Sequence, residues 1–129
     1  MEDMVVPALK RGGYRVRRNV EVGTRFGVTK HRIDTHVEDA DGHIHLVSLK
    51  WQQVQGTAEQ KIPFEIICLA DLLLHDETYY KAHLVLGGGG WKYKDFYTSG
   101  GLRPHLTNAD MVNVLVLEEF IGLANQGKL

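Results

Sequence analysis

Three successive segments between residues 14 and 51 have the pattern of β-strands, and a long helical segment follows them. Tyr14 to Val22 comes close to the two-residue period of a strand with one basic side, and Lys30 to Glu38 is expected to be a second strand. The turn residues Asp39 to Gly42 predict a hairpin into a third strand, His43 to Trp51. A helix is expected from Thr57 to about Leu74. A chain with this order is expected to form a mixed sheet flanked by helices, because a strand–helix–strand connection normally places its helix across a sheet face.

The remaining elements are shorter. They are a helix at Asp3–Arg11 that ends at Gly12-Gly13, a buried strand at Ala82–Leu86, a strand at Val112–Leu117, and an amphipathic helix at Glu119–Asn125 that stops at Gly127. The predicted order is therefore αβββαβ followed by a C-terminal strand and helix, which is an α/β (α+β) fold with a mixed central sheet.

The start of the long helix has two interpretations. Thr57 and Gln60 have the spacing of a capping box, which would open the helix at Thr57. Pro63 then either kinks the helix or lies in the first turn of a helix that begins near Ile62, where its missing N–H costs nothing.

Length and composition favour one soluble domain over residues 1–129. Apolar residues make up 43% of the 129 residues and charged residues 24%, so the chain can bury a core. The longest apolar runs, such as Ile66 to Leu74, fall far short of the ~20 residues that span a bilayer. The acidic N-terminus lacks the pattern of a secretory signal, and the single Cys68 cannot form an internal disulfide. We therefore expect a cytoplasmic protein.

Basic residues are concentrated at one end of the sequence. Residues 1–32 carry eight Lys/Arg against three Asp/Glu, whereas residues 33–129 carry seven against thirteen. Such clustering is typical of contact with phosphates, although an ordinary solvated face is the simpler interpretation. The candidate nucleic-acid contacts of this basic arm are Arg15, Arg17, Arg18, Arg25, Lys30 and Arg32.

An acid, a lysine and a second acid follow one another across the predicted hairpin and helix. Lys50 shares a strand face with Ser48 and has aliphatic neighbours, a costly place for a charge unless a carboxylate or a phosphate lies close. Phosphodiester hydrolysis needs a divalent metal, an activated water and a cation facing the developing charge. Asp34 and Glu65 are candidate ligands for that metal, and Lys50 is the candidate cation. Hard oxygen ligands favour Mg²⁺, with Mn²⁺ as a substitute.

At these residues the sequence resembles the PD-(D/E)XK nuclease superfamily. Its αβββαβ core presents an Asp on one strand, an acid-x-Lys on the next and then a helix, and the resemblance covers roughly residues 3–87. The segments SLKWQ and GTAEQKIPFE look like the strand-to-helix passage of some phage and restriction-type members. The resemblance implies a restriction-endonuclease-like fold and an intracellular protein of bacterial or phage origin.

The chain departs from the superfamily pattern at two positions. Ile33 stands at the position of the motif's Pro, and Ser48 stands at the position of its acid. A hydroxyl cannot replace a metal-binding carboxylate, but some members carry Ser-x-Lys and move the acid to the following helix. Glu65, fifteen residues after Lys50, is the preferred replacement, and Glu59 is the second choice.

Two further residues complete the candidate site. Glu21 is a possible metal contact, for which pairing with neighbouring arginines is the simpler interpretation. Gln52 shares the face of Lys50 and is a candidate for orienting water or touching a phosphate, although a polar residue at a strand end is equally expected there.

The predicted function is a Mg²⁺-dependent endonuclease that acts on DNA and assembles as a homodimer or a larger homo-oligomer. The first alternative is a nucleic-acid-binding or structural protein that keeps the nuclease fold without catalysis, as Ser48 would suggest. The second is a metalloenzyme with ligands His36, His43 and His45. Gly87–Gly90 lacks the known phosphate-loop spacings and is expected to be a turn that lets the backbone approach a substrate or a subunit.

Overall fold

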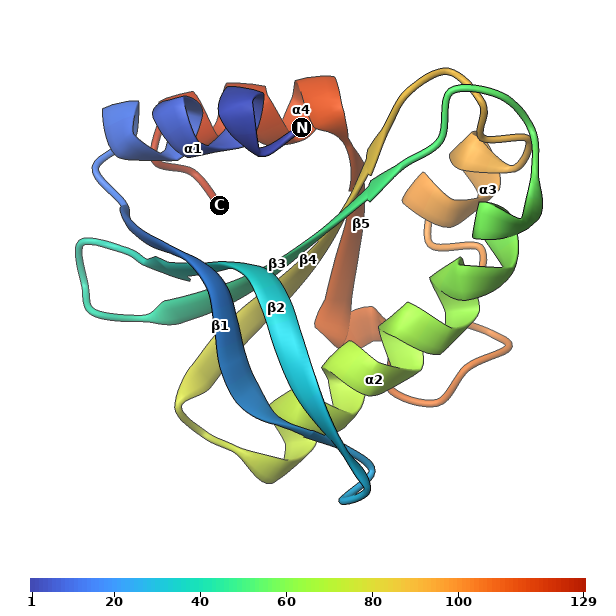
Figure 1. Cartoon of the computed structure of the whole chain (residues 1–129), viewed down its shortest axis with the longest axis horizontal. Helices are drawn as coiled ribbons and strands as arrows, with labels where there is room; N and C mark the ends of the chain where they lie inside the picture. Colours follow the sequence, from blue (N-terminus) through green and yellow to red (C-terminus); the bar gives the residue numbers. More distant parts are fainter.

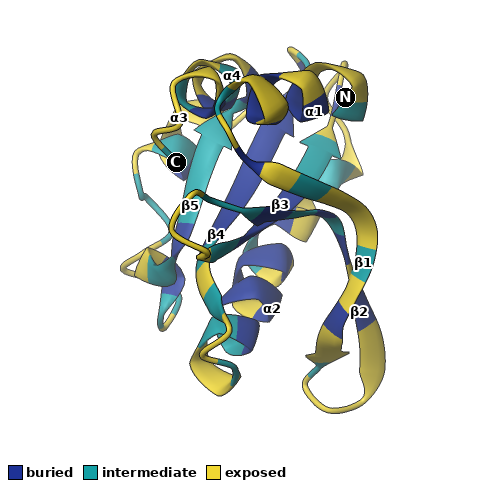
Figure 2. Ribbon diagram, turned by 90° about the vertical axis from the view of Figure 1, so that its left-hand side faces the viewer, coloured by how far each residue is buried: buried dark blue, intermediate teal, exposed yellow.

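The computed structural model, which describes all residues 1–129, places a five-stranded sheet between two layers of helices (Figures 1 and 2). Helices α1 (Glu2–Arg11) and α4 (Leu117–Asn125) cover one face of the sheet. Helix α2 (Lys61–His75) covers the other face. None of the helices is both long and apolar enough to span a bilayer.

The sheet is mixed, as the sequence predicted. Its strands, in spatial as well as sequence order, are β1 (Arg15–Arg25), β2 (Thr29–Glu38), β3 (Ile44–Trp51), β4 (Tyr79–Gly87) and β5 (Val112–Val116). The β1–β2 and β2–β3 pairs are antiparallel, and the β3–β4 and β4–β5 pairs are parallel. The αβββαβ order with a C-terminal strand and helix is confirmed.

Three short helical segments refine the predicted elements. They are a 3₁₀ turn η1 (Thr57–Gln60), helix α3 (Lys94–Thr98) and a 3₁₀ turn η2 (Ala109–Met111). The capping box at Thr57 is not formed, because η1 has Gly56 as its N-cap and no side-chain cap hydrogen bond. Helix α2 instead begins at Lys61, so Pro63 lies in its first turn, as one of the two interpretations proposed.

Alternation along β3 distributes its side chains between two cores. Leu46 packs in the core under α2, whereas Val47 packs in the core beneath α1 and α4. Because side chains alternate along a strand, Ser48 and Lys50 fall on the α2 side with Leu46. The alternation of this one strand therefore decides which helix can reach the lysine.

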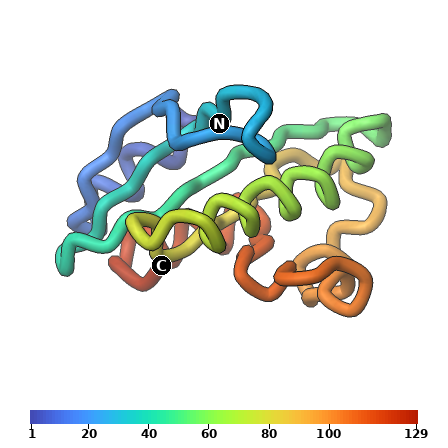
Figure 3. The backbone as a smooth tube through the Cα atoms, turned by 90° about the horizontal axis from the view of Figure 1, so that it is seen from below, coloured from blue at the N-terminus to red at the C-terminus, as the bar shows by residue number.

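The β1–β2 hairpin extends beyond the rest of the sheet. β2 pairs with β1 along its whole length, but it pairs with β3 only from Thr35 to Glu38. The outer half of the hairpin, closed by a turn at Arg25–Thr29, therefore continues without β3 beside it and lies next to α2 (Figure 3). Most of this outer half is exposed (Figure 2).

The glycine run closely approaches the chain's own backbone, and its approach to a substrate or a subunit stays a prediction. A Cβ added to Gly88 would lie 2.4 Å from the carbonyl oxygen of Gln52, and one added to Gly90 would lie 2.6 Å from the backbone of Val54. Only glycine fits at such contacts. The run thus lets the loop after β4 pack on the loop after β3.

Candidate functional site

Lys50 and Glu65 meet under the sheet on the α2 side. The Lys50 Nζ lies 3.8 Å from Oε2 of Glu65, whose side chain is only 6% exposed. Strand alternation sends Lys50 toward α2, and Glu65 is on the buried face of that helix, with Ile62 and Ile66. The structure thus brings together two of the residues that the sequence singled out, and their catalytic roles stay a prediction.

Two further basic side chains surround the same carboxylate. Arg25 Nη2 lies 3.7 Å from Oε2 of Glu65, and His31 Nε2 lies 3.8 Å from Oε1. Burial alone would raise the pKa of Glu65, but His31, Lys50 and the Ser48 hydroxyl lower this pKa more, so that its net value is below the ordinary one. Glu65 is therefore an anion at neutral pH.

His31 was missed by the sequence analysis although a signal for it was present. Strand alternation turns His31 inward between Lys30 and Arg32, which are both exposed. The His31 side chain is fully buried, and neither ring nitrogen has a hydrogen-bond partner. The Nε of Arg25 is likewise buried without a partner. Such orphaned polar groups cost about 1–3 kcal/mol each, so this cluster is not arranged for stability alone.

Asp34 lies apart from the Lys50–Glu65 pair. Its Oδ2 accepts a 2.7 Å hydrogen bond from the Leu49 backbone N–H, where the pairing of β2 with β3 has just ended. The same residue lines a cavity of about 390 Å³ with Glu2, Asp3 and Trp51, on the α1 side of the sheet. No ion pair or hydrogen bond joins Asp34 to Lys50. The structure therefore shows no direct contact of Asp34 with Lys50, and the convergence of Asp34, Lys50 and Glu65 on a metal stays a prediction.

The other candidate acids and Gln52 hold neighbouring segments of the chain together. Glu59 accepts hydrogen bonds from the Tyr93 N–H at 2.9 Å and the Tyr97 hydroxyl at 3.2 Å. Burial, with help from Glu59, raises the pKa of Tyr97 to about 12. Glu21 instead pairs with Arg32 at 4.0 Å, the simpler of its two interpretations.

Gln52 uses both ends of its amide within the protein. Its Nε2 donates to the Gly90 carbonyl at 2.9 Å, and its Oε1 accepts from the Ala58 N–H at 3.2 Å. These bonds leave the amide braced between two loops. The geometry supports neither metal binding by Glu59 or Glu21 nor a catalytic role for Gln52.

The basic arm is mostly on the surface. Arg15, Arg17, Arg18, Lys30 and Arg32 are exposed, whereas Arg25 turns toward Glu65. Two of the exposed residues have partners: Arg18 lies 3.7 Å from Glu2, and Arg32 donates to the side chain and carbonyl of Asn19. The other three form no ion pair within the chain and are available to phosphates.

The three predicted histidine ligands are not assembled. His45 is buried and contacts Asp39 at 3.0 Å and His83 at 3.1 Å. His36 is the register partner of Leu46 and therefore lies on the α2 side of the sheet, the face away from His45. The side chains that do gather are those of Asp39, Asp41 and His43 in the β2–β3 turn, within 4.8 Å of one another. The histidine metalloenzyme is therefore not supported.

The predicted nuclease ligands fit a divalent metal only at Asp34. The Glu65 carboxylate already pairs with basic side chains. Oδ1 of Asp34 makes no hydrogen bond, and Asp34 borders the 390 Å³ cavity on the α1 side. Mg²⁺ needs only one or two protein carboxylates, because water and substrate phosphate complete its coordination shell. A single ligand at Asp34 is compatible with that chemistry.

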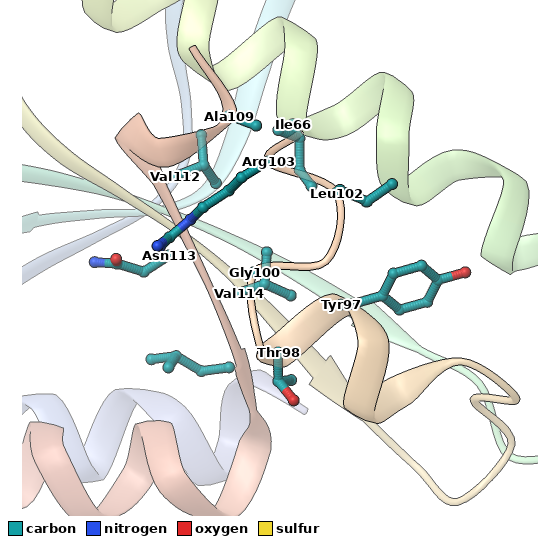
Figure 4. Close-up of a pocket in the computed structure, with 11 residues that line it drawn as sticks. Ile66, Tyr97, Thr98, Gly100, Leu102, Arg103, Ala109, Val112, Asn113 and Val114 are labelled. Carbon is teal, nitrogen blue, oxygen red and sulfur yellow. The ribbon is translucent and has the colours of Figure 1, made fainter. Parts of the chain in front are cut away.

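A second pocket lies away from these residues. It has a volume of about 190 Å³ between α2, α3 and β5, and Arg103 runs along it toward Asn113 (Figure 4). None of the candidate site residues lines it.

The comparison with protein families returned one match. A model described as a PD-(D/E)XK nuclease superfamily domain matches residues 1–128. The comparisons with curated proteins and with solved structures found no match. The expectation of a single domain over residues 1–129 stays a prediction.

Proposed function

Because the chain belongs to the PD-(D/E)XK nuclease superfamily, we propose that it is a metal-dependent endonuclease that hydrolyses phosphodiester bonds of DNA. The observation that carries the proposal is the ion pair of Lys50 with Glu65, since Lys50 stands at the lysine of the motif. A lysine that is held by a buried carboxylate and still partly exposed is suited to act on a substrate anion.

Lys50, Glu65 and Asp34 have complementary roles in this proposal. Lys50 faces the charge that develops on the phosphate, and Glu65 holds the ammonium in place. Asp34 would hold Mg²⁺, or Mn²⁺ in its place. When bound, the metal supplies Lewis-acid activation of the phosphate and a water of lowered pKa. The exposed arginines and lysine of the basic arm would contact the DNA backbone.

We also propose that the protein acts as a homodimer or a larger homo-oligomer. Cutting both strands of a duplex needs two active centres, and one chain of this size offers one motif lysine. Sedimentation of the purified protein tests this point directly.

Plasmid nicking tests the proposed activity. The wild type is expected to nick or linearise plasmid with Mg²⁺ or Mn²⁺, and Lys50→Met is expected to lose about 100-fold in rate. Lys128→Met is the matched control, because Lys128 is exposed at the C-terminus and makes no ion pair. An inactive wild type, or equal rates for wild type and Lys50→Met, would refute catalysis at this lysine.

A second candidate function is nucleic-acid binding without catalysis. Ser48 at the acid position and the separation of Asp34 from Glu65 favour it. This candidate predicts salt-dependent retention on DNA with no cleavage under any divalent metal.

A further inference from the structure

Two exposed phenylalanines form a pair beside the Lys50–Glu65 cluster. Phe26 in the hairpin turn is 49% exposed, and Phe64 in α2 is 51% exposed. Their rings meet edge to face, with centroids 6.1 Å apart. Val28, on the other side of the turn, is 83% exposed. A folded chain thus keeps an apolar surface in water where its hairpin meets its helix.

The pair is joined to the cluster through its immediate neighbours in sequence. Arg25 precedes Phe26, Glu65 follows Phe64, and these two charged residues lie 3.7 Å apart. The hairpin turn and α2 therefore touch twice, once through the partly buried Arg25–Glu65 ion pair and once through exposed rings. A molecule resting on the rings would lie on the surface beside the Lys50–Glu65 cluster, with the carboxylate of Glu65 buried beneath it.

The backbone holds Phe26 in an unusual conformation. Its φ is +56°, in the left-handed region that side chains rarely adopt. Two hydrogen bonds fix the turn around it: Gly27 N–H donates to the Thr24 hydroxyl, and Val28 N–H donates to the Arg25 carbonyl, each at 3.0 Å. Strain of this kind is typical of positions with a function.

We propose that Phe26 and Phe64 form a stacking platform for an unpaired nucleobase, so that the preferred substrate contains a single-stranded segment. The inference rests on the proposed function and deepens it by naming the substrate class. Aromatic rings offer a face to any base, but the bases of a duplex already stack on one another and present only their edges. An unpaired base is thus the group that fits.

The charge around the platform favours nucleic acid over a protein partner. Lys30 and Arg32 are exposed on the strand that follows the turn, and Arg25 precedes it. Aromatic side chains interleaved with basic ones are the pattern of surfaces that bind single-stranded nucleic acid. Lys30, which forms no ion pair within the chain, would hold a phosphate beside the stacked base.

Binding without a metal tests the platform. Fluorescence anisotropy in EDTA would compare a labelled single-stranded oligonucleotide with the blunt duplex of the same sequence. Phe26→Ala and Phe64→Ala are each expected to weaken single-strand binding about tenfold, with less than about a twofold change for the duplex. Phe26→Trp is expected to restore single-strand binding, because it keeps a stacking face.

Controls separate stacking from general damage. Phe96→Ala is the matched variant, because Phe96 is a similarly exposed phenylalanine on α3 and is expected to leave both affinities unchanged. Urea denaturation of each variant reports whether it is folded.

Three results would overturn the inference. They are unchanged single-strand affinity in both alanine variants, equal losses on single strand and duplex, and a wild-type dimer that Phe26→Ala converts to monomer in sedimentation velocity. The last would make the rings an interface between two copies of the chain. The assay needs no cleavage, so single-strand binding that survives in Lys50→Met supports the platform even where the nuclease proposal fails.

Discussion

Two buried polar clusters lie on opposite faces of the sheet, and they differ in how completely their polar groups are hydrogen-bonded. On the α1–α4 side, Asp39, His45, His83 and Asn113 form a continuous chain with contacts of 3.0, 3.1 and 3.4 Å. On the α2 side, three basic groups stand 3.7–3.8 Å from Glu65, and both ring nitrogens of His31 have no partner.

On the α1–α4 side, one set of donors and acceptors satisfies all three contacts between the four side chains. Asp39 can only accept, so His45 donates to it through Nε2 and accepts through Nδ1. His83 must then donate to His45 through Nε2 and accept from the Asn113 amide. Burial lowers the pKa of both histidines, that of His83 to about 3, so both rings are neutral at neutral pH.

The comparison sets a cluster whose polar groups all have hydrogen-bond partners against one in which several buried polar groups have none. A fully satisfied network rigidifies and specifies a core, whereas unsatisfied groups weaken it and are expected where a ligand supplies the missing partners. Stability measurements on the two clusters should therefore respond in different ways.

The largest expected effect is on the α1–α4 side. His83→Ala leaves a cavity and strips the partners of His45 and Asn113, and we expect it to lower the free energy of unfolding by about 4 kcal/mol. Urea denaturation measures this loss. His75→Ala, at an exposed histidine, is the control and should change little. If His83→Ala lowers the free energy of unfolding by less than about 1 kcal/mol, this hydrogen-bonded network contributes little to the stability of the fold.

His83 should also make the stability of the protein depend on pH. Its pKa falls from 6.5 to about 3 on folding, so the unfolded state binds the additional proton and stability is lost as the pH drops below 6.5. Between pH 7 and pH 4 this loss is expected to be about 3 kcal/mol, which urea titrations at each pH would measure. In His83→Phe the dependence over that window should flatten, and an unchanged slope would assign the loss to other groups.

A smaller effect is expected for the central carboxylate on the α2 side. Glu65→Gln keeps the shape but leaves Arg25 and Lys50 without a counter-charge, which should cost about 1–2 kcal/mol in the same urea experiment. The wild-type contribution is present at neutral pH and fades as the pH drops through the lowered pKa of Glu65. Glu118→Gln, at an exposed glutamate, should be neutral. A neutral Glu65→Gln would mean that the cluster carries no net stabilisation.

The smallest effect on stability is expected at His31. His31→Phe removes two buried nitrogens that have no partner, so the free energy of unfolding should stay the same or rise by up to about 1 kcal/mol. The plasmid-nicking rate of the same variant should fall if the cluster serves catalysis. Destabilisation as large as that of His83→Ala would erase the contrast between the two clusters.

The sequence was informative where local rules decide the structure. Strand alternation put Lys50 on one face with Ser48, and the spacing after Lys50 selected Glu65 as the candidate acid. The structure brings these two residues to 3.8 Å. The turn at Asp39–Gly42 was likewise readable, because Asp39 Oδ1 accepts the N–H groups of Asp41 and His43.

Long-range packing decided the rest. The pairing of β2 with β3 ends beside Asp34, so its carboxylate binds a strand N–H rather than facing Lys50. Glu59 and Gln52 form hydrogen bonds with residues 90–97, and no local sequence pattern predicts where that segment lies. His83 also has a signal in the sequence, because it is a lone histidine in the apolar segment Ala82–Leu86.

The limited pairing of β2 with β3 leaves the outer half of the β1–β2 hairpin without a third strand beside it. Its root is held by the ladder at Thr35–Glu38, and its far half contacts α2 through Arg25–Glu65, His31–Glu65 and Phe26–Phe64. A displacement of the tip would change the distance from Arg25 to Glu65 without breaking the root ladder. Such a displacement would also change the electrostatic field at Lys50, because Lys50 and Arg25 share the Glu65 carboxylate.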